Sequence, residues 1–244
     1  MSTIRGARER ARMEVTAAIK QEARNQLARE GAAKLSLRAV ARELGMVSSA
    51  LYRYFPSRDE LLTALIVDAY DAVGAAAESA LTSAPGQDDH LARWSALCSA
   101  VRGWALEHPH EYALIYGSPV PGYRAPEDTI GPASRVGLAL ISIVRDAHRA
   151  DGIALPPLTP HMRPEAERLA AEIAPDLPPA VAVALIAAWS QLFGLISFEL
   201  FGQFHRVVED RDTFFAHVTD RLAHEVGLRP TRAAGAAPGS SAGS

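Results

Sequence analysis

The sequence contains a single cysteine, Cys98, and no other thiol. One cysteine cannot form an internal disulfide or supply the clustered thiolates of a structural zinc site, so the chain suits a reducing compartment. The first fifteen residues, MSTIRGARERARMEV, also lack the apolar run of about 7–15 residues that a secretory signal needs. We therefore expect a cytoplasmic protein in which Cys98, set in an apolar helical pattern, is a core residue rather than a nucleophile.

Signals for β-strands are almost absent, since runs of alternating β-branched residues do not occur. Alanine, leucine, arginine and glutamate dominate at helical spacing, which predicts an all-α fold. We expect residues 1–56 to form one domain, residues 57–228 a second, and residues 229–244 a disordered tail. The expected helices span residues 13–29, 36–44, 47–55, 57–82, 91–105, 136–147, 163–174, 180–198 and 210–227, with proline-rich connections at 117–128 and 156–164.

Catalytic motifs are also missing. The sequence has no G-x-S-x-G, H-E-x-x-H or phosphate-loop motif and no recognisable set of acid, base and nucleophile. A helical enzyme remains an alternative without a candidate catalytic residue. His108 and His110 form an H-x-H pair, but two histidines at this spacing are a weak metal signal. We expect no metal and no cofactor.

Charge is distributed unevenly along the chain. The net charge is −3, yet residues 1–60 hold 12 Lys and Arg against 7 Asp and Glu, whereas the rest of the chain is acidic. A basic N-terminal segment on an acidic body indicates that only this segment meets a polyanion. Chance scatter of surface charge is the alternative.

Residues 180–198 contain no charged side chain, and 19 residues are enough to span a bilayer. A membrane-anchored adaptor is therefore an alternative reading of the chain. Ser190, Gln191 and Ser197 interrupt the run, however, and no cluster of Lys or Arg flanks it. We favour a helix buried in the body and between two subunits, with no membrane contact.

Two short helices in the basic segment are joined by a tight turn at Gly45. Ser36 is a suitable N-cap for the first, and Gly45 occupies the position after it that favours a left-handed backbone. The second must end by Phe55, because the proline that follows disfavours helical geometry. Ser57 and Glu60 then have the spacing of a capping box. This is the helix-turn-helix arrangement, which presents its second helix to the DNA major groove. Its expected core is Val40, Ala41, Leu44, Leu51 and Phe55.

The exposed side of this arrangement has the chemistry of DNA contacts. Tyrosine and serine hydroxyls can bond phosphates without reading sequence, and Arg58 adds charge at a helix start. Arg38 is the best candidate for a bidentate contact with guanine, with a phosphate contact as the alternative. Because Val47 cannot cap the second helix, we expect Ser48 to cap it, which leaves open whether Ser48 also reads a base. The candidate DNA-binding residues are Ser36, Arg38, Ser48, Ser49, Tyr52, Arg53, Tyr54 and Arg58.

Residues 35–66, LSLRAVARELGMVSSALYRYFPSRDELLTALI, resemble the DNA-binding domain of the TetR family of bacterial regulators. The resemblance rests on four features: a serine before the helix expected at residues 36–44, a V-A-x-x-x-G stretch, an L-Y-x-Y-F ending to the next helix, and a basic residue two positions after the proline. The pair Met46-Val47 departs from the V-S that usually follows the glycine. The likeness covers about residues 13–65, and residues 108–126, HPHEYALIYGSPVPGYRAP, are similar to an actinobacterial type of C-terminal domain.

The resemblance implies an all-α homodimer with an N-terminal three-helix DNA-binding domain and a larger helical domain for ligand binding and dimerisation. The dimer interface would lie near residues 179–204 and 210–227. The implied function is a repressor that binds a palindromic DNA operator and is released by a small apolar or amphipathic effector. Ser190, Gln191 and Glu199 are polar candidates for the ligand site or the interface. The aromatic ligand candidates, for which core packing is the alternative, are Trp94, Trp104, Tyr112, Tyr116, Trp189 and Phe193.

Overall fold

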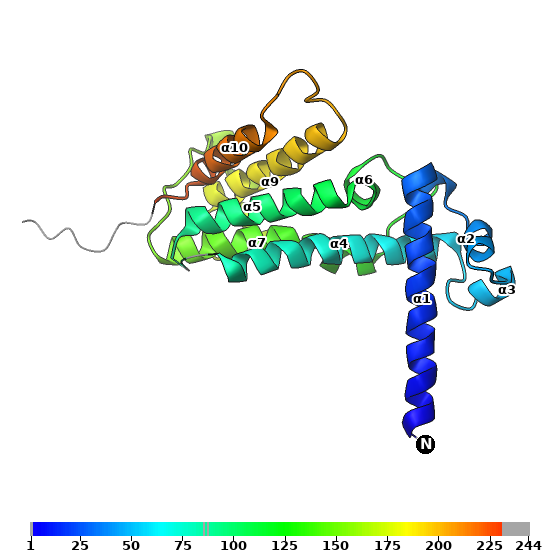
Figure 1. The fold of residues 1–244 in the computed structure, drawn as a ribbon. Helices are drawn as coiled ribbons and strands as arrows, with labels where there is room; N and C mark the ends of the chain where they lie inside the picture. The colour runs from blue at the N-terminus through cyan, green and yellow to red at the C-terminus, as the bar shows by residue number, and fades with distance from the viewer. Residues whose placement is uncertain (1, 85, 87, 231–244) are drawn as a thin grey trace, which may run out of the picture.

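The protein is described by a computed structural model, in which residues 2–84, 86 and 88–230 are placed. These residues form ten α-helices and no strand, which confirms the all-α prediction (Figure 1). The predicted tail lies outside the described residues from 231 onward. The α-helices are α1 Ser2–Glu30, α2 Leu37–Glu43, α3 Ser48–Leu51, α4 Arg58–Ser83, α5 His90–Glu107, α6 Pro109–Tyr116, α7 Ile130–Arg149, α8 Arg163–Ile173, α9 Pro179–Leu200 and α10 Arg211–Val226.

Four helix predictions need correction, and one of them is α7, which begins at Ile130 rather than at residue 136. α1 begins at Ser2, well before the expected start at residue 13, because its first turns hold too few large apolar residues to give a helical period. α3 ends at Leu51, although the Phe55 amide still donates to the Leu51 carbonyl, so the chain stays coiled up to the proline. α6 was not predicted. Pro109 ends α5 but also opens α6, where its missing N–H costs nothing.

The N-terminal helices form a small head around their own core. α1, α2, α3 and the first turns of α4 share this core. Val40, Ala41, Leu51 and Phe55 are buried there as expected, whereas Leu44 is half-buried. The head is therefore built by side chains that converge from four helices on one apolar centre.

The body has a separate core. α4, α5 and α7 pack side by side along its length, and α9 and α10 lie together against α5 (Figure 1). Cys98 is fully buried, and this burial raises the pKa of its thiol, so the prediction of a core cysteine is confirmed. α4 belongs to both the head and the body, so it connects them.

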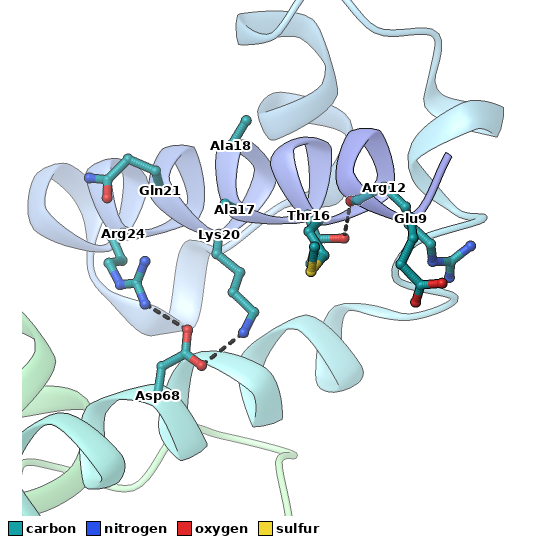
Figure 2. A pocket seen from close by; sticks show the side chains of 10 residues that line it. Glu9, Arg12, Thr16, Ala17, Ala18, Lys20, Gln21, Arg24 and Asp68 are labelled. Carbon is teal, nitrogen blue, oxygen red and sulfur yellow. Dashed lines mark hydrogen bonds and ion pairs between the residues drawn. The ribbon is translucent and has the colours of Figure 1, made fainter. Parts of the chain in front are cut away.

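Ion pairs at the junction hold α1 against the body. Arg24 donates to Asp68 on α4 at 2.7 Å and to Glu111 on α6 at 3.0 Å, and Lys20 donates to Asp68 at 2.8 Å. Figure 2 shows Lys20 and Arg24 pointing to Asp68 from α1. The head and the body are thus tied through a guanidinium shared by two body helices.

α9 is the one described helix that is long and apolar enough to cross a membrane by length and composition, a test that core helices of other proteins also pass. Its buried side chains face the body's core; they include Val181, Leu185, Ala188, Leu192 and Ile196. Ile186 and Trp189, on another side of α9, are partly exposed, at 36% and 38%. Burial on all sides is therefore not achieved within one chain.

Candidate DNA-binding site

The start of α2 is fixed by two polar side chains. The Ser36 hydroxyl accepts a hydrogen bond from the Ala39 amide at 3.4 Å, which confirms it as the N-cap. The Ser36 amide in turn donates to the buried Gln26 side chain of α1 at 3.1 Å. Gln26 was missed in the sequence, because a glutamine at helical spacing carries no signal for burial. The Ser36 hydroxyl is therefore already used to cap α2, and Gln26 of α1 fixes the position of the Ser36 backbone. A contact between Ser36 and DNA would have to form at this fixed helix start.

The turn between α2 and α3 is made by Gly45, whose φ of 64° lies in the left-handed region that favours glycine. The Met46 amide donates to the Ala41 carbonyl at 2.8 Å, which closes the end of α2. The expectation that Ser48 caps α3 is wrong. Val47 is the N-cap residue and supplies no side-chain bond, so Ser48 is the first helical residue. Its hydroxyl makes no hydrogen bond within the described chain, which leaves it open to another partner.

Exposed polar side chains of α2, α3 and the residues just after α3 lie on the outer surface of the head. Arg38, Ser49 and Arg53 are exposed, and Tyr52 is 41% exposed. Neither Arg38 nor Arg53 forms an ion pair with any residue that the structure describes. Two cations without protein partners on one small surface fit an anionic ligand such as the phosphate backbone.

Tyr54 and Arg58 are more constrained than predicted. Tyr54 is half-buried and packs on the head's core, with the Arg12 guanidinium 5.4 Å from its ring centre. Arg58 donates through Nε to the Leu35 carbonyl at 3.2 Å and through Nη2 to the Ala32 carbonyl at 3.0 Å. Arg58 therefore holds the loop before α2 in place, a role that its sequence position does not reveal. Its Nη1 reaches only Asp59, at 3.4 Å.

The aromatic ligand candidates separate into two groups. The ring centre of Tyr116 lies 4.2 Å from that of Phe193 and 5.0 Å from that of Tyr112. Trp189 lies about one turn before Phe193 on α9, and their ring centres are 5.7 Å apart. The Tyr112 hydroxyl is bonded to the Phe193 carbonyl and to Ser197, and its burial raises the pKa of the phenol to about 12. These four residues form one aromatic cluster, defined as Tyr112, Tyr116, Trp189 and Phe193.

The two remaining aromatic candidates lie apart from this cluster. The Trp94 indole donates to the Thr219 carbonyl of α10 at 3.0 Å and is 1% exposed, so its ring is part of the body's core. Trp104 packs against His108 at 5.5 Å between ring centres. Neither residue lines a described cavity, so core packing accounts for both positions.

A cavity of about 340 Å³ lies between α7, α8 and α9. It is mainly apolar, with Ser134 and Glu172 as its polar lining residues, and Trp189 is the one aromatic candidate that borders it. Gly137 of α7 also lines it, and a Cβ added there would meet no atom within 4 Å. A volume near the lower end of the usual range for small-molecule sites, about 300–1,000 Å³, makes this cavity a candidate ligand site.

The remaining polar candidates have partners of their own. Glu199 forms a two-bond ion pair with Arg102 of α5, both distances being 2.7 Å. Ser190 and Gln191 are exposed and bond to carbonyls of their own helix. Among the described residues no group of three or more acidic, histidine or cysteine side chains is placed to hold a metal ion.

A helical body carrying a head of this geometry, with a capped α2, a glycine turn and exposed arginines on α2 and just after α3, defines a helix-turn-helix transcriptional regulator. Residues 19–65 match the family described as bacterial regulatory proteins, tetR family. Residues 94–222 match the family described as tetracyclin repressor-like, C-terminal domain. The chain belongs to the TetR family, whose members are regulators of transcription and not enzymes, so the enzyme alternative is removed.

Curated relatives agree with this assignment. HTH-type transcriptional regulators from Mycobacterium tuberculosis and Mycobacterium bovis are 43% identical over 211 residues, covering 82% of this chain and 86% of theirs. Among solved structures, a protein described as a regulatory protein, SCO4313, superposes with a TM-score of 0.71 at 36% identity over 88% of this chain and 98% of its own. The TetR family regulator PfmR from Thermus thermophilus shares the fold, with a TM-score of 0.55 at 20% identity over 84% and 97%.

Proposed function

We propose that the protein is a cytoplasmic, ligand-responsive repressor that binds a palindromic operator as a homodimer and leaves it when a small apolar or amphipathic effector binds the body. Each subunit places α3 in one major groove, and the two grooves are separated by about 34–36 Å, one helical turn, or a multiple of it. The dimer has two conformations that differ in the distance between the two heads, and one of them fits the operator. The effector can shift this equilibrium only because its affinities for the two conformations differ.

The observation that carries this proposal is the pair of exposed cations without an ion-pair partner among the described residues, Arg38 on α2 and Arg53 just after α3. Arg24 and Arg102, by contrast, are held in carboxylate ion pairs that join one helix to another. Cations without an ion-pair partner, together with the exposed Ser49 and Tyr52, are arranged for phosphates and base edges.

Dimerisation is supported by the outer face of α9. Phe198 and Phe201 are 53% and 46% exposed, and Gly194 has open space beside it. Ala187 and Gly194 are small enough to let a second helix approach closely, while the exposed aromatics gain most from being covered. We propose that α9 and α10 of two subunits form a four-helix bundle through this face.

The cavity between α7, α8 and α9 is the proposed effector site. Gly137 supports this proposal. Alanine at this position would stabilise α7 by about 1 kcal/mol and would fit without a clash, yet the chain has glycine there, which leaves the space in the cavity empty. An apolar lining with a carboxylate at Glu172 suits an amphipathic molecule. The site adjoins α9, so an occupant contacts both the body and the proposed dimer helix.

DNA binding is tested by selecting sites from random duplexes with the full-length protein, then measuring binding of Arg38→Ala with Arg53→Ala to the selected site. We expect a palindromic site and a loss of at least tenfold in affinity for the double variant, while Arg163→Ala with Arg229→Ala, two exposed arginines of the body, binds as the wild type. Equal affinity of the wild type and the Arg38 and Arg53 double variant would remove the proposed DNA surface.

The effector site is tested by screening small molecules for release of this DNA. Gly137→Leu fills the cavity, so we expect it to bind DNA normally but to resist release. Gly131→Leu changes the same helix at an exposed position outside the cavity lining and keeps the response. A Gly137→Leu protein that is released at wild-type effector concentrations would exclude this cavity.

A further inference from the structure

The N-terminal part of α1 projects beyond the head. Residues 6–14 are all exposed, and Figure 1 shows α1 continuing past α3 on the side opposite to α9 and α10. From residue 6 onward, the first residue of α1 that is even half-buried is Val15. The segment of residues 2–14 is called the arm here. At about 1.5 Å per residue, the arm extends roughly 20 Å from the head.

The arm is not packed on the body. A groove of about 690 Å³ separates its lower side from α4, with Glu9, Arg12, Met13 and Thr16 on one wall and Asp68 on the other (Figure 2). Met13 is 59% exposed. Residues 6–14 make about two and a half turns in which no side chain is buried, so they gain little tertiary stabilisation, and isolated helices of this length are marginal in water. An external partner would supply the stabilisation that the fold does not.

The arm's charge identifies the kind of partner. Arg8, Arg10 and Arg12 outnumber Glu9 and Glu14 in its described part. Within the part of the chain that the structure describes, neither Arg8 nor Arg10 forms an ion pair. Cations on a helix that stays in water are suited to phosphates.

One face of the arm is continuous with the DNA-binding surface. Arg12 lies over the ring of Tyr54, directly after α3, at 5.4 Å. Arg8 lies one helical turn before Arg12 on the same face, whereas Arg10 is rotated by about 200° from Arg8. A duplex that contacts α3 and Tyr54 therefore meets the Arg8 face before it meets Arg10.

We propose that the arm binds the DNA backbone outside the half-site that α3 occupies. This inference rests on the proposed DNA-binding function and on a dimer axis at α9 and α10. Since the arm points away from these helices, it lies over the outer flank of each half-site. Its length corresponds to about six base pairs at roughly 3.4 Å each. Arg8 and Arg12 contact phosphates there and add affinity without reading sequence.

The experiment compares the full-length wild type with Arg8→Ala and with Arg10→Ala, its matched control on the opposite face. Two duplexes are used: one ends at the edges of the selected site, and the other adds ten base pairs on each side. We expect the wild type to bind the longer duplex more tightly and with a steeper salt dependence. Arg8→Ala should lower the slope of log K against log salt by about 0.9 per subunit on the longer duplex and leave it unchanged on the shorter one.

Three results would overturn the inference. If the wild type binds both duplexes alike, no flank contact exists, although α3 binding stands. If Arg10→Ala lowers the slope as much as Arg8→Ala, the effect is general charge and not a directed contact. If the wild type binds neither duplex above random DNA, the proposed function and the arm fall together. Far-UV circular dichroism of each variant checks that the remaining helices are intact.

Discussion

Replacing Arg58 tests two roles in one side chain. Its Nε and Nη2 groups bond the Leu35 and Ala32 carbonyls at 3.2 and 3.0 Å, whereas Nη1 has only an exposed aspartate at 3.4 Å. The fork of five donors can therefore hold the loop before α2 and still offer Nη1 to a phosphate.

The expected cost follows from these bonds. A hydrogen bond to a charged group contributes about 1.5–3 kcal/mol, but 29% of the Arg58 side chain is exposed, so water replaces part of what is lost. For two bonds we take the lower end, and expect Arg58→Ala to lower the free energy of unfolding by about 2–3 kcal/mol. Arg58→Lys keeps the charge, but a compact ammonium cannot span both carbonyls, so its stability should fall nearly as far.

Urea unfolding measures the free energy of unfolding of each variant. The salt dependence of binding to the selected operator reports the phosphate contact, and it is measured under conditions in which every variant is folded. We expect Arg58→Ala to lower the salt slope by about one per subunit and Arg58→Lys to keep it. Unchanged stability of Arg58→Ala would refute the loop-holding role. A slope lowered equally by both variants would refute the phosphate contact.

Three further changes have defined outcomes. Burial, and then Arg93, lowers the pKa of the His90 side chain, so the unfolded chain binds its proton more readily; the free energy of unfolding should fall as pH decreases below about 6.5, and His90→Gln should flatten this dependence in urea titrations. Gly227 has a φ of 103°, and a Cβ there would collide with the Ala154 carbonyl, so Gly227→Ala should cost more than about 2 kcal/mol in the same assay, against no measurable loss for Gly131→Ala. Arg38→Ala should relax preference at one operator position by about 1–3 kcal/mol in competition binding, and an even loss across all sequences would instead indicate a phosphate contact.

The helix-turn-helix was predictable because each local signal pointed to the same geometry. Ser36 caps α2, Gly45 takes the left-handed turn, and Leu51 and Phe55 fill the core, each position being determined by residues nearby in the chain. Ser48 was mispredicted because a cap was assumed to be necessary. α3 begins without a side-chain cap, and this short helix is held in place by the burial of Leu51.

The proposed ligand site was harder to predict from the sequence. Aromatic residues at helical spacing look alike whether they fill a core, as Trp94 does, or border a cavity, as Trp189 does. The decisive residue is Gly137, whose meaning depends on empty space between α7, α8 and α9, and no pattern within one helix encodes that space. Likewise, Arg58 is bonded to carbonyls more than twenty residues away.

The ion pairs of Arg24 turn α1 into a lever. Asp68 and Glu111 hold one guanidinium from two body helices, so a shift of α6 relative to α4 pulls on α1 at that point. Arg8 lies about 24 Å from this fulcrum along the helix, and a tilt of roughly 10° displaces it by about 4 Å. A small shift between α4 and α6 would therefore produce a larger displacement at the N-terminal end of α1. A displacement of a few ångströms there is enough to move Arg8 out of contact with a phosphate.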